Sequence, residues 1–156
     1  MYHFGFIDRT TYILTSIIGR GSIYIMKLRS GTLRPIVILW LPEIKSGVKV
    51  DHITTHTSAI PQNPTALSPR QDRRIHTFSV LYSPRLIHDE QTTHCLFVHN
   101  DLLLKYADAY DSASEPVYVG WEKWGRSHTR FQRIPGIYHW MRCVDKMMLE
   151  IVAHEA

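Results

Sequence analysis

The sequence predicts a mostly β protein of the propeller, sandwich or barrel class, with one short helix near residues 100–110. Short segments rich in β-branched and aromatic residues recur along the chain. Turn signals separate them at about the eight-to-twelve-residue spacing of antiparallel all-β domains. The chain has 156 residues, of which 44% are hydrophobic and 21% charged. These are globular values, so we expect a single β-rich domain over residues 1–156.

The first part of the chain contains strand-like segments at residues 9–17, 22–28, 35–41 and 48–56. In the second segment, one face carries Tyr24, Met26 and Leu28, and the opposite face carries Ile23 and Ile25. The third segment is a continuous apolar run, which is typical of a strand covered on both faces. In the fourth, alternation predicts that Val48, Val50, His52, Thr54 and His56 share one face. Glycines near residues 19–21, 31 and 47 mark the turns between these strands.

The second part of the chain is less regular. Residues 60–73 contain three prolines and little apolar periodicity, which predicts a long internal loop. Strands are expected at residues 74–82 and 92–98, followed by a helix over residues 102–110 with Asn100 and Asp101 as its cap and acidic first turn. Residues 137–152 fit both a helix and a β-hairpin, because apolar spacing and β-branched composition favour different answers.

Charge and composition limit the function classes. The 18 Lys and Arg residues exceed the 14 Asp and Glu residues by only four, and this excess is scattered. Nucleic-acid-binding proteins usually concentrate charge on one face, so composition argues against that class. The alternative function is a basic β-rich nucleic-acid-associated domain. It would use Arg70, Arg73, Arg74, Arg126 and Arg130 on phosphates.

Neither a metal site nor a catalytic centre is predicted, and we expect no cofactor. On a strand, His52 and His56 lie about 13 Å apart, too far for one zinc ion. His94 and Cys95 point to opposite strand faces, and no Gly-x-Ser-x-Gly nucleophile motif is present. The N-terminal residues lack the pattern of a secretory signal, and no apolar run is long enough to span a bilayer. We therefore expect an intracellular protein, cytoplasmic or nuclear, with no membrane contact.

The most distinctive stretch is Trp121-Glu-Lys-Trp124-Gly125-Arg-Ser-His-Thr129-Arg130-Phe131. Its candidate interaction or scaffold residues are Trp121, Trp124, Arg126, Thr129, Arg130 and Phe131. Trp and Arg are favoured at protein interfaces, which would make this segment a docking patch. Internal packing is the commoner explanation, with the indoles between the short helix and the sheet and Arg130 stacked on a ring or paired with Glu122. Gly125 indicates a positive φ or a close backbone approach.

This segment resembles the Trp-Gly-x-x-x-Thr-Arg-aromatic signature in the C-terminal region of fungal F-box-like proteins. Other matches follow in order: Gly21-Ser22-Ile23-x-Ile25, Leu39-x-Leu41-Pro42-x-Ile44, Val50-x-x-Ile53-x-x-His56-Thr57, Arg74-Ile75-His76-x-Phe78, Leu96-Phe97-Val98-His99 and Tyr138-x-Trp140-x-Arg142-x-Val144. The final hairpin departs from the pattern, because Asp145-Lys146 stands where a glycine-containing turn is expected.

The resemblance implies an incomplete, WD-repeat-like β-propeller region, as a fragment of a larger propeller. It implies a non-enzymatic protein–protein interaction module similar to the substrate-binding region of an F-box-type ubiquitin-ligase receptor. The match does not include the adaptor-binding F-box, so the ligase role does not follow from it. An incomplete propeller exposes strand edges and blade faces, so we expect an unknown protein partner or self-association through those edges.

Overall fold

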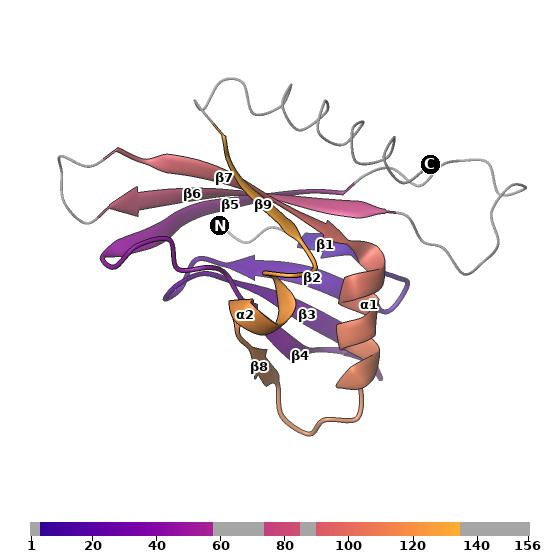
Figure 1. Ribbon diagram of the computed structural model, residues 1–156. Coiled ribbons are helices and arrows are strands. Elements are labelled where there is room, and N and C mark those ends of the chain that lie inside the picture. Colours follow the sequence, from indigo (N-terminus) through magenta and orange to yellow (C-terminus); the bar gives the residue numbers. More distant parts are fainter. Residues whose placement is uncertain (1–3, 58–73, 85–89, 135–156) are drawn as a thin grey trace, which may run out of the picture.

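The computed structural model describes residues 4–57, 74–84 and 90–134, which form two β-sheets and two short helices (Figure 1). Sheet A has the strand order β1-β2-β3-β4-β8, and sheet B has the order β5-β6-β7-β9. The fold is therefore mostly β, as the sequence predicts. The element bounds are β1 Phe4–Phe6, β2 Thr11–Ser16, β3 Ser22–Arg29, β4 Thr32–Trp40, β5 Val48–Thr57, β6 Ile75–Pro84, β7 Thr92–His99, α1 Asn100–Ala109, β8 Val117–Val119, α2 Trp121–Trp124 and β9 Arg130–Ile134.

Sheet A begins as an antiparallel run of four strands, to which β8 adds as a parallel neighbour of β4. The predicted strands at residues 9–17, 22–28 and 35–41 are confirmed as β2, β3 and β4. Ser30 and Gly31 form the turn between β3 and β4 with φ values of 49° and 77°. Positive φ at both central residues is the backbone that a tight antiparallel hairpin requires. The strands β1 and β8 lie outside the predicted ranges.

Sheet B is antiparallel throughout, and its last strand arrives after a long insertion. The predicted strands at residues 48–56, 74–82 and 92–98 are confirmed as β5, β6 and β7, whereas β9 is an addition. The predicted shared face of β5 is wrong. A register shift between Val50 and His52 breaks the alternation, and Val50 and Ile53 both lie in the core, whereas Asp51 is exposed. A β-bulge of this kind changes which side chains face inward.

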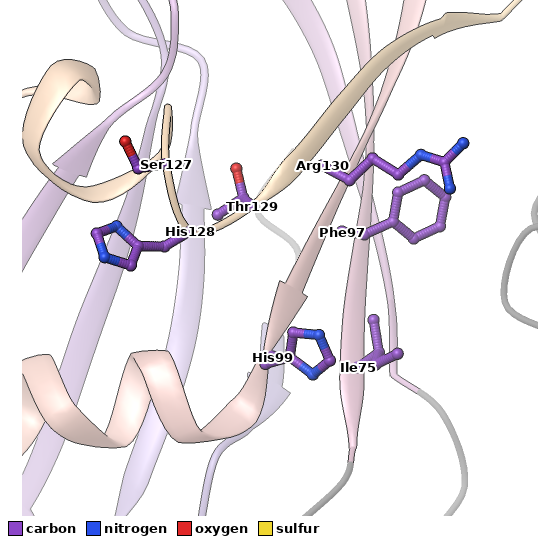
Figure 2. Close-up of a pocket in the computed structure, with 7 residues that line it drawn as sticks. All are labelled: Ile75, Phe97, His99, Ser127, His128, Thr129 and Arg130. Atoms are coloured by element: carbon purple, nitrogen blue, oxygen red, sulfur yellow. The ribbon is translucent and has the colours of Figure 1, made fainter. Parts of the chain in front are cut away.

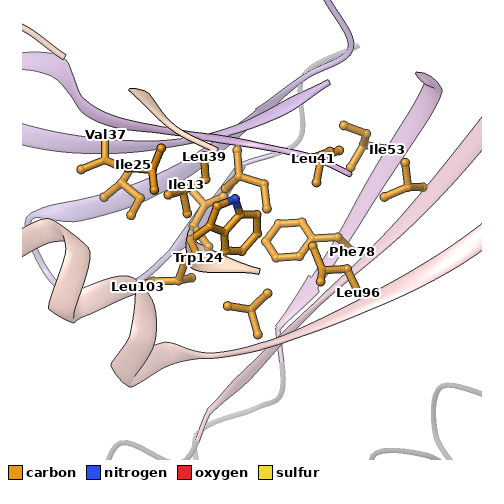
Figure 3. Packing of buried hydrophobic residues seen from close by; sticks show 14 of the residues in the cluster. Ile13, Ile25, Val37, Leu39, Leu41, Ile53, Phe78, Leu96, Leu103 and Trp124 are labelled. Atoms are coloured by element: carbon orange, nitrogen blue, oxygen red, sulfur yellow. The ribbon is translucent and has the colours of Figure 1, made fainter. Parts of the chain in front are cut away.

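The core lies between the two sheets and is closed by side chains from both helices (Figure 3). Sheet A contributes Ile13, Ile25 and Leu39 to it, and sheet B contributes Phe78 and Leu96. Leu103 and Ala107 of α1 and Trp124 of α2 belong to the same cluster. Burying these apolar side chains together supplies the main driving force for folding.

Helix α1 confirms the predicted helix but starts earlier, and the expected role of Asn100 is wrong. The N-cap position is His99, and Asn100 is the first helical residue. The Asn100 side chain is fully buried and bridges two strands instead: its amide donates to the Ile7 carbonyl at 3.3 Å, and its oxygen lies 2.6 Å from His76 Nε2. Because that oxygen can only accept, His76 carries its proton on Nε2. The hydrogen bonds to water that burial removes are therefore replaced within the protein.

The remaining expectations concern two segments of the chain, the closure of the sheets and membrane-spanning helices. The predicted loop over residues 60–73 and the helix or hairpin over residues 137–152 lie outside the described residues. Sheets A and B form no closed barrel or closed propeller within residues 4–57, 74–84 and 90–134. Neither α1 nor α2 is long and apolar enough to cross a membrane.

The glycines of the β2–β3 hairpin give a test of this packing. Gly19 and Gly21 both have positive φ, but a Cβ on Gly21 would lie 2.8 Å from Val50 Cγ2, whereas a Cβ on Gly19 meets nothing within 4 Å. We expect Gly19→Ala to cost about 1 kcal/mol through backbone strain alone, and Gly21→Ala to cost roughly 2–4 kcal/mol, because it also overpacks the space between the sheets. Urea denaturation measures both values. Equal losses in the two variants would contradict the described contact between Gly21 and β5.

Candidate functional site

The tryptophan-rich segment forms a compact turn that connects β8 to β9. Residues Trp121–Trp124 make the single turn of α2. The Gly125 amide donates to the Trp121 carbonyl at 2.8 Å, and the Thr129 hydroxyl donates to the Gly125 carbonyl at 2.7 Å. The Thr129 amide also donates to that carbonyl, at 3.0 Å. These local bonds fix the chain reversal that leads into sheet B.

Trp124 is part of the core and is fully buried. Its indole N–H donates to the carbonyl of Trp40 at 2.8 Å, and its ring meets the Trp121 ring edge to face at a centroid distance of 5.2 Å. Figure 3 shows the indole among Leu39, Leu103, Phe78 and Leu96. A buried indole N–H needs an acceptor, and the end of β4 supplies it. Trp124 therefore lies where side chains of the helices meet those of both sheets.

The structure confirms one of the two predicted reasons for a glycine at position 125. Its φ is −92°, so the predicted positive φ is wrong. The close approach is present, because a Cβ at this position would lie 2.0 Å from the Trp121 ring. Any larger residue would displace that ring. Glycine is therefore required for space rather than for backbone conformation.

The two arginines of the segment have different surroundings. Arg126, and not Arg130, pairs with Glu122, at 2.9 Å and one helical turn away, with both side chains exposed. The expected pairing of Arg130 with Glu122 is therefore wrong. An exposed pair at this spacing contributes only about 0.3–0.5 kcal/mol. Arg130 and Thr129 instead line a surface pocket of about 270 Å³.

That pocket lies between the segment and the ends of β6 and β7 (Figure 2). Its other lining residues are Ile75, Phe97, His99, Ser127 and His128. Figure 2 shows the hydroxyls of Ser127 and Thr129 pointing away from His99, and the Arg130 side chain extending beside Phe97. The polar groups do not converge on one point, as a nucleophile and its base would need to.

Phe131 takes part in an aromatic cluster at the start of β9. It stacks on His94 with centroids 4.9 Å apart and meets Trp121 edge to face at 5.5 Å. Burial, with a smaller contribution from the positive charge of Arg133, lowers the pKa of His94. The ring is therefore neutral at pH 7 and packs as an aromatic group. Phe131 and His94 thus help to hold β9 on sheet B.

The structure also bears on the predicted absence of a metal site and on the arginines of the nucleic-acid alternative, two of which have contacts within the chain. Among the described residues, no group of three or more His, Cys, Asp or Glu side chains could hold a metal ion. Arg74 donates to the carbonyls of Phe6 and Ile7, and Arg126 is paired with Glu122. Arg70 and Arg73 lie outside the described residues. Arg74 and Arg126 therefore have partners within the chain, and Arg130 lines the pocket described above.

The feature that sequence reasoning missed is the outer face of sheet A. We use this name for the sheet surface turned away from sheet B. Pairing register places side chains from all five strands side by side: Phe6 opposite Tyr12, Tyr12 opposite Met26, Leu14 opposite Tyr24, Tyr24 opposite Ile38, and Ile38 opposite Tyr118. Strand alternation gives this face Phe4, Phe6, Tyr12, Leu14, Ser16, Ser22, Tyr24, Met26, Leu28, Leu33, Pro35, Ile38, Trp40 and Tyr118. None of these residues is charged.

This face is open to solvent at its two edges and near the β3–β4 turn, whereas its residues Ser16, Ser22, Met26 and Ile38 are buried. Phe4 is 50% exposed, Phe6 57% and Tyr118 62%, and Leu28 and Leu33 are exposed as well. The rings also order one another: Phe4 stacks on Tyr12 at 5.1 Å, and Trp40 stacks on Tyr118 at 5.8 Å. The Arg20 guanidinium, from the β2–β3 turn, lies 5.4 Å from the Trp40 ring centroid. Sheet B and the core residues of both helices lie on the opposite face.

The largest exposed apolar patch of a protein is often a functional surface, which makes this face a candidate contact surface. The sequence holds a partial signal for it, since Tyr24, Met26 and Leu28 alternate with the core residues of β3. Searches of protein-family models, of curated proteins and of solved structures found no match to this chain.

The burial of Trp124 leads to a testable prediction. We expect Trp124→Ala to destabilise the fold by about 3–5 kcal/mol, because it leaves a cavity between the sheets. Trp124→Phe should cost roughly 1–3 kcal/mol, since the Trp40 carbonyl then loses its buried donor. Denaturant unfolding of both variants measures these losses. Ile18→Ala, at an exposed position of the β2–β3 turn, serves as the control and should change stability little. A Trp124→Ala variant as stable as this control would contradict the core position.

Proposed function

We propose that this chain is a non-enzymatic protein–protein interaction module whose contact surface is the outer face of sheet A. The observation that carries the proposal is the face itself: five strands present mostly aromatic and aliphatic side chains, and none of these strand residues is charged, although the Arg20 guanidinium lies over Trp40 at one end of the face. Keeping such a surface in water is unfavourable, and covering it with another protein removes that cost. Aromatic residues such as Tyr118 and Trp40 are also the residue types that dominate binding energy at interfaces.

The strand order supports the resemblance to a propeller-like region. Strands β1 to β4 form one antiparallel run of four, and β5, β6, β7 and β9 form a second. Four-stranded antiparallel sheets that pack face to face are the units of propellers. The parallel strand β8 is an addition to that pattern. In such an arrangement the outer face of sheet A is where a further sheet packs.

By the same resemblance, we propose that the module is similar to the substrate-binding region of an F-box-type ubiquitin-ligase receptor. The proposed function extends only to binding a protein partner. The tryptophan segment then has a scaffold role, because Trp124 and Gly125 are committed to internal packing. The exposed aromatic groups on sheet A, and not the indole of Trp124, make the contact.

The partner that best fits this face is another apolar sheet face, and for the purified chain it is a second copy. A charge-free surface is complementary to itself, so a two-fold symmetric contact is allowed. From the spacing of five strands, the face covers roughly 500 Å², so two copies bury about 1,000 Å² in total. That area is at the lower end of specific protein interfaces, which predicts a weak and reversible dimer.

We expect the purified chain to self-associate at concentrations on the order of 10–100 µM. Tyr118→Lys and Phe6→Lys each place an unpaired charge in the contact, at opposite edges of sheet A. Each should weaken the dimer at least about tenfold in Kd, because the added charge loses its hydration there. Sedimentation equilibrium measures the change.

Ile18→Lys is the matched control. Ile18 is 70% exposed, but it lies in the β2–β3 turn rather than on the face. It should leave the dimer unchanged. A clean monomer with cooperative melting at every concentration would refute the proposed contact. Dimers that persist in both face variants would instead point to pairing through strand edges such as β5 or β9.

A further inference from the structure

A second pocket lies beside the β3–β4 turn, on the side of sheet A opposite to its outer face. It has a volume of about 430 Å³ and is bounded by that turn and by the loop that follows α1. Lys27, Arg29 and Arg34 line it from the sheet, and Ser112 and Ser114 line it from the loop. The pocket shares no polar residue with the proposed interface, so it requires an explanation of its own.

Three cationic residues of this pocket lie on one face of the β3–β4 hairpin. Lys27 and Arg34 are directly opposite each other in the β3–β4 register, and Arg29 is two residues further along the same face. Like charges directly opposite on neighbouring strands repel and destabilise the pair. Alternation puts all three side chains on one side of the hairpin. Such an arrangement needs a counter-charge.

Among the described residues, Asp111 is the one carboxylate that pairs with these cations. Asp111 lies 2.6 Å from Arg29 and 3.6 Å from Lys27, and Arg29 also donates to its backbone carbonyl. The hydrogen bond from Arg29, together with the charge of Lys27, holds the pKa of the Asp111 carboxyl below its usual value. Asp111 is therefore ionised at neutral pH, and the three cations exceed it by two charges.

Arg34 receives none of this compensation. No carboxylate within the part of the chain that the structure describes pairs with it, and its side chain is exposed at the pocket. The hydroxyls of Ser30, Thr32, Ser112 and Ser114 surround the same space. Hydroxyl, ammonium and guanidinium groups together are the donors that a phosphate oxygen accepts from.

We propose that this pocket binds a small phosphorylated metabolite, whose phosphate lies between Lys27 and Arg34. A phosphate monoester carries about −1.5 to −2 charges at neutral pH, which matches the surplus in the pocket. The volume is within the roughly 300–1,000 Å³ of small-molecule sites and leaves room for the organic part of the ligand. The lining residues Ser30, Thr32, Ser112 and Ser114 offer hydroxyl donors to the remaining phosphate oxygens.

The test uses the full chain at low ionic strength, with inorganic phosphate and glycerol 3-phosphate as probes and sodium chloride at matched ionic strength as the reference. Isothermal titration calorimetry should show binding of both probes, with the monoester at least threefold tighter. Arg34→Gln should weaken both at least tenfold. Arg133→Gln, an exposed arginine on β9, is the matched control and should bind as the unchanged chain does.

Three results would overturn the proposal. The first is the absence of heat beyond the chloride reference at about 20 mM phosphate, a concentration at which even a millimolar affinity is detected. The second is equal binding by the Arg34→Gln and Arg133→Gln variants, which would mean that the anion is attracted by overall charge. The third is a monoester that binds no tighter than inorganic phosphate, which would show that the pocket does not recognise the organic part of a metabolite. The Lys27→Gln variant repeats the comparison from the opposite strand, with exposed Lys49→Gln on β5 as its control.

Discussion

The hydrogen bond from the indole of Trp124 to the carbonyl of Trp40 is the contact on which the rest of the structure depends. It ties the single turn of α2 to the end of β4 while the ring fills the space that Phe78 and Leu96 reach from sheet B. The chain can return to sheet B as β9 only after this turn is made. The buried Trp124 side chain thereby fixes where the insertion between β7 and β9 packs. Glycine at position 125 leaves the space that the neighbouring Trp121 ring occupies.

Sheet A is apolar on both sides, and this distinguishes it from an ordinary sandwich sheet. Ile13, Ile25 and Leu39 face the core, while Tyr12, Tyr24 and Ile38 alternate with residues of that set on the outer face. A sheet with one solvated face normally carries polar residues there. The composition of β3 and β4 is that of strands between two layers, and among the described residues sheet B supplies one of them. In the function that we propose, a protein partner supplies the other.

Local pattern predicted most strands and the helix α1, because alternation and turn residues act within one element. The continuous apolar run at residues 35–41 also predicted burial on both faces, and Leu39 and Ile38 are both buried although they lie on opposite sides of β4. The local sequence pattern did not predict features that depend on contacts between distant segments. Pairing with β4 and β7 makes strands of the short stretches β8 and β9, and a bulge opposite β6 reorders the faces of β5. The outer face depends on register across five strands, which no single segment reveals. The Glu122 and Arg126 pair is different, since its spacing of one helical turn was readable in the sequence.

In the function that we propose, the outer face of sheet A is covered by protein when the chain associates. Hydroxyl-radical footprinting with mass spectrometry, over a range of chain concentrations, tests it most directly. We expect Phe4, Phe6 and Tyr118 to lose reactivity with hydroxyl radicals together as the chain concentration rises. Ile18 and Ile44, which are exposed outside this face, should keep their reactivity. Unchanged reactivity of the three aromatic residues while the chain associates, or equal protection of the isoleucines, would contradict it.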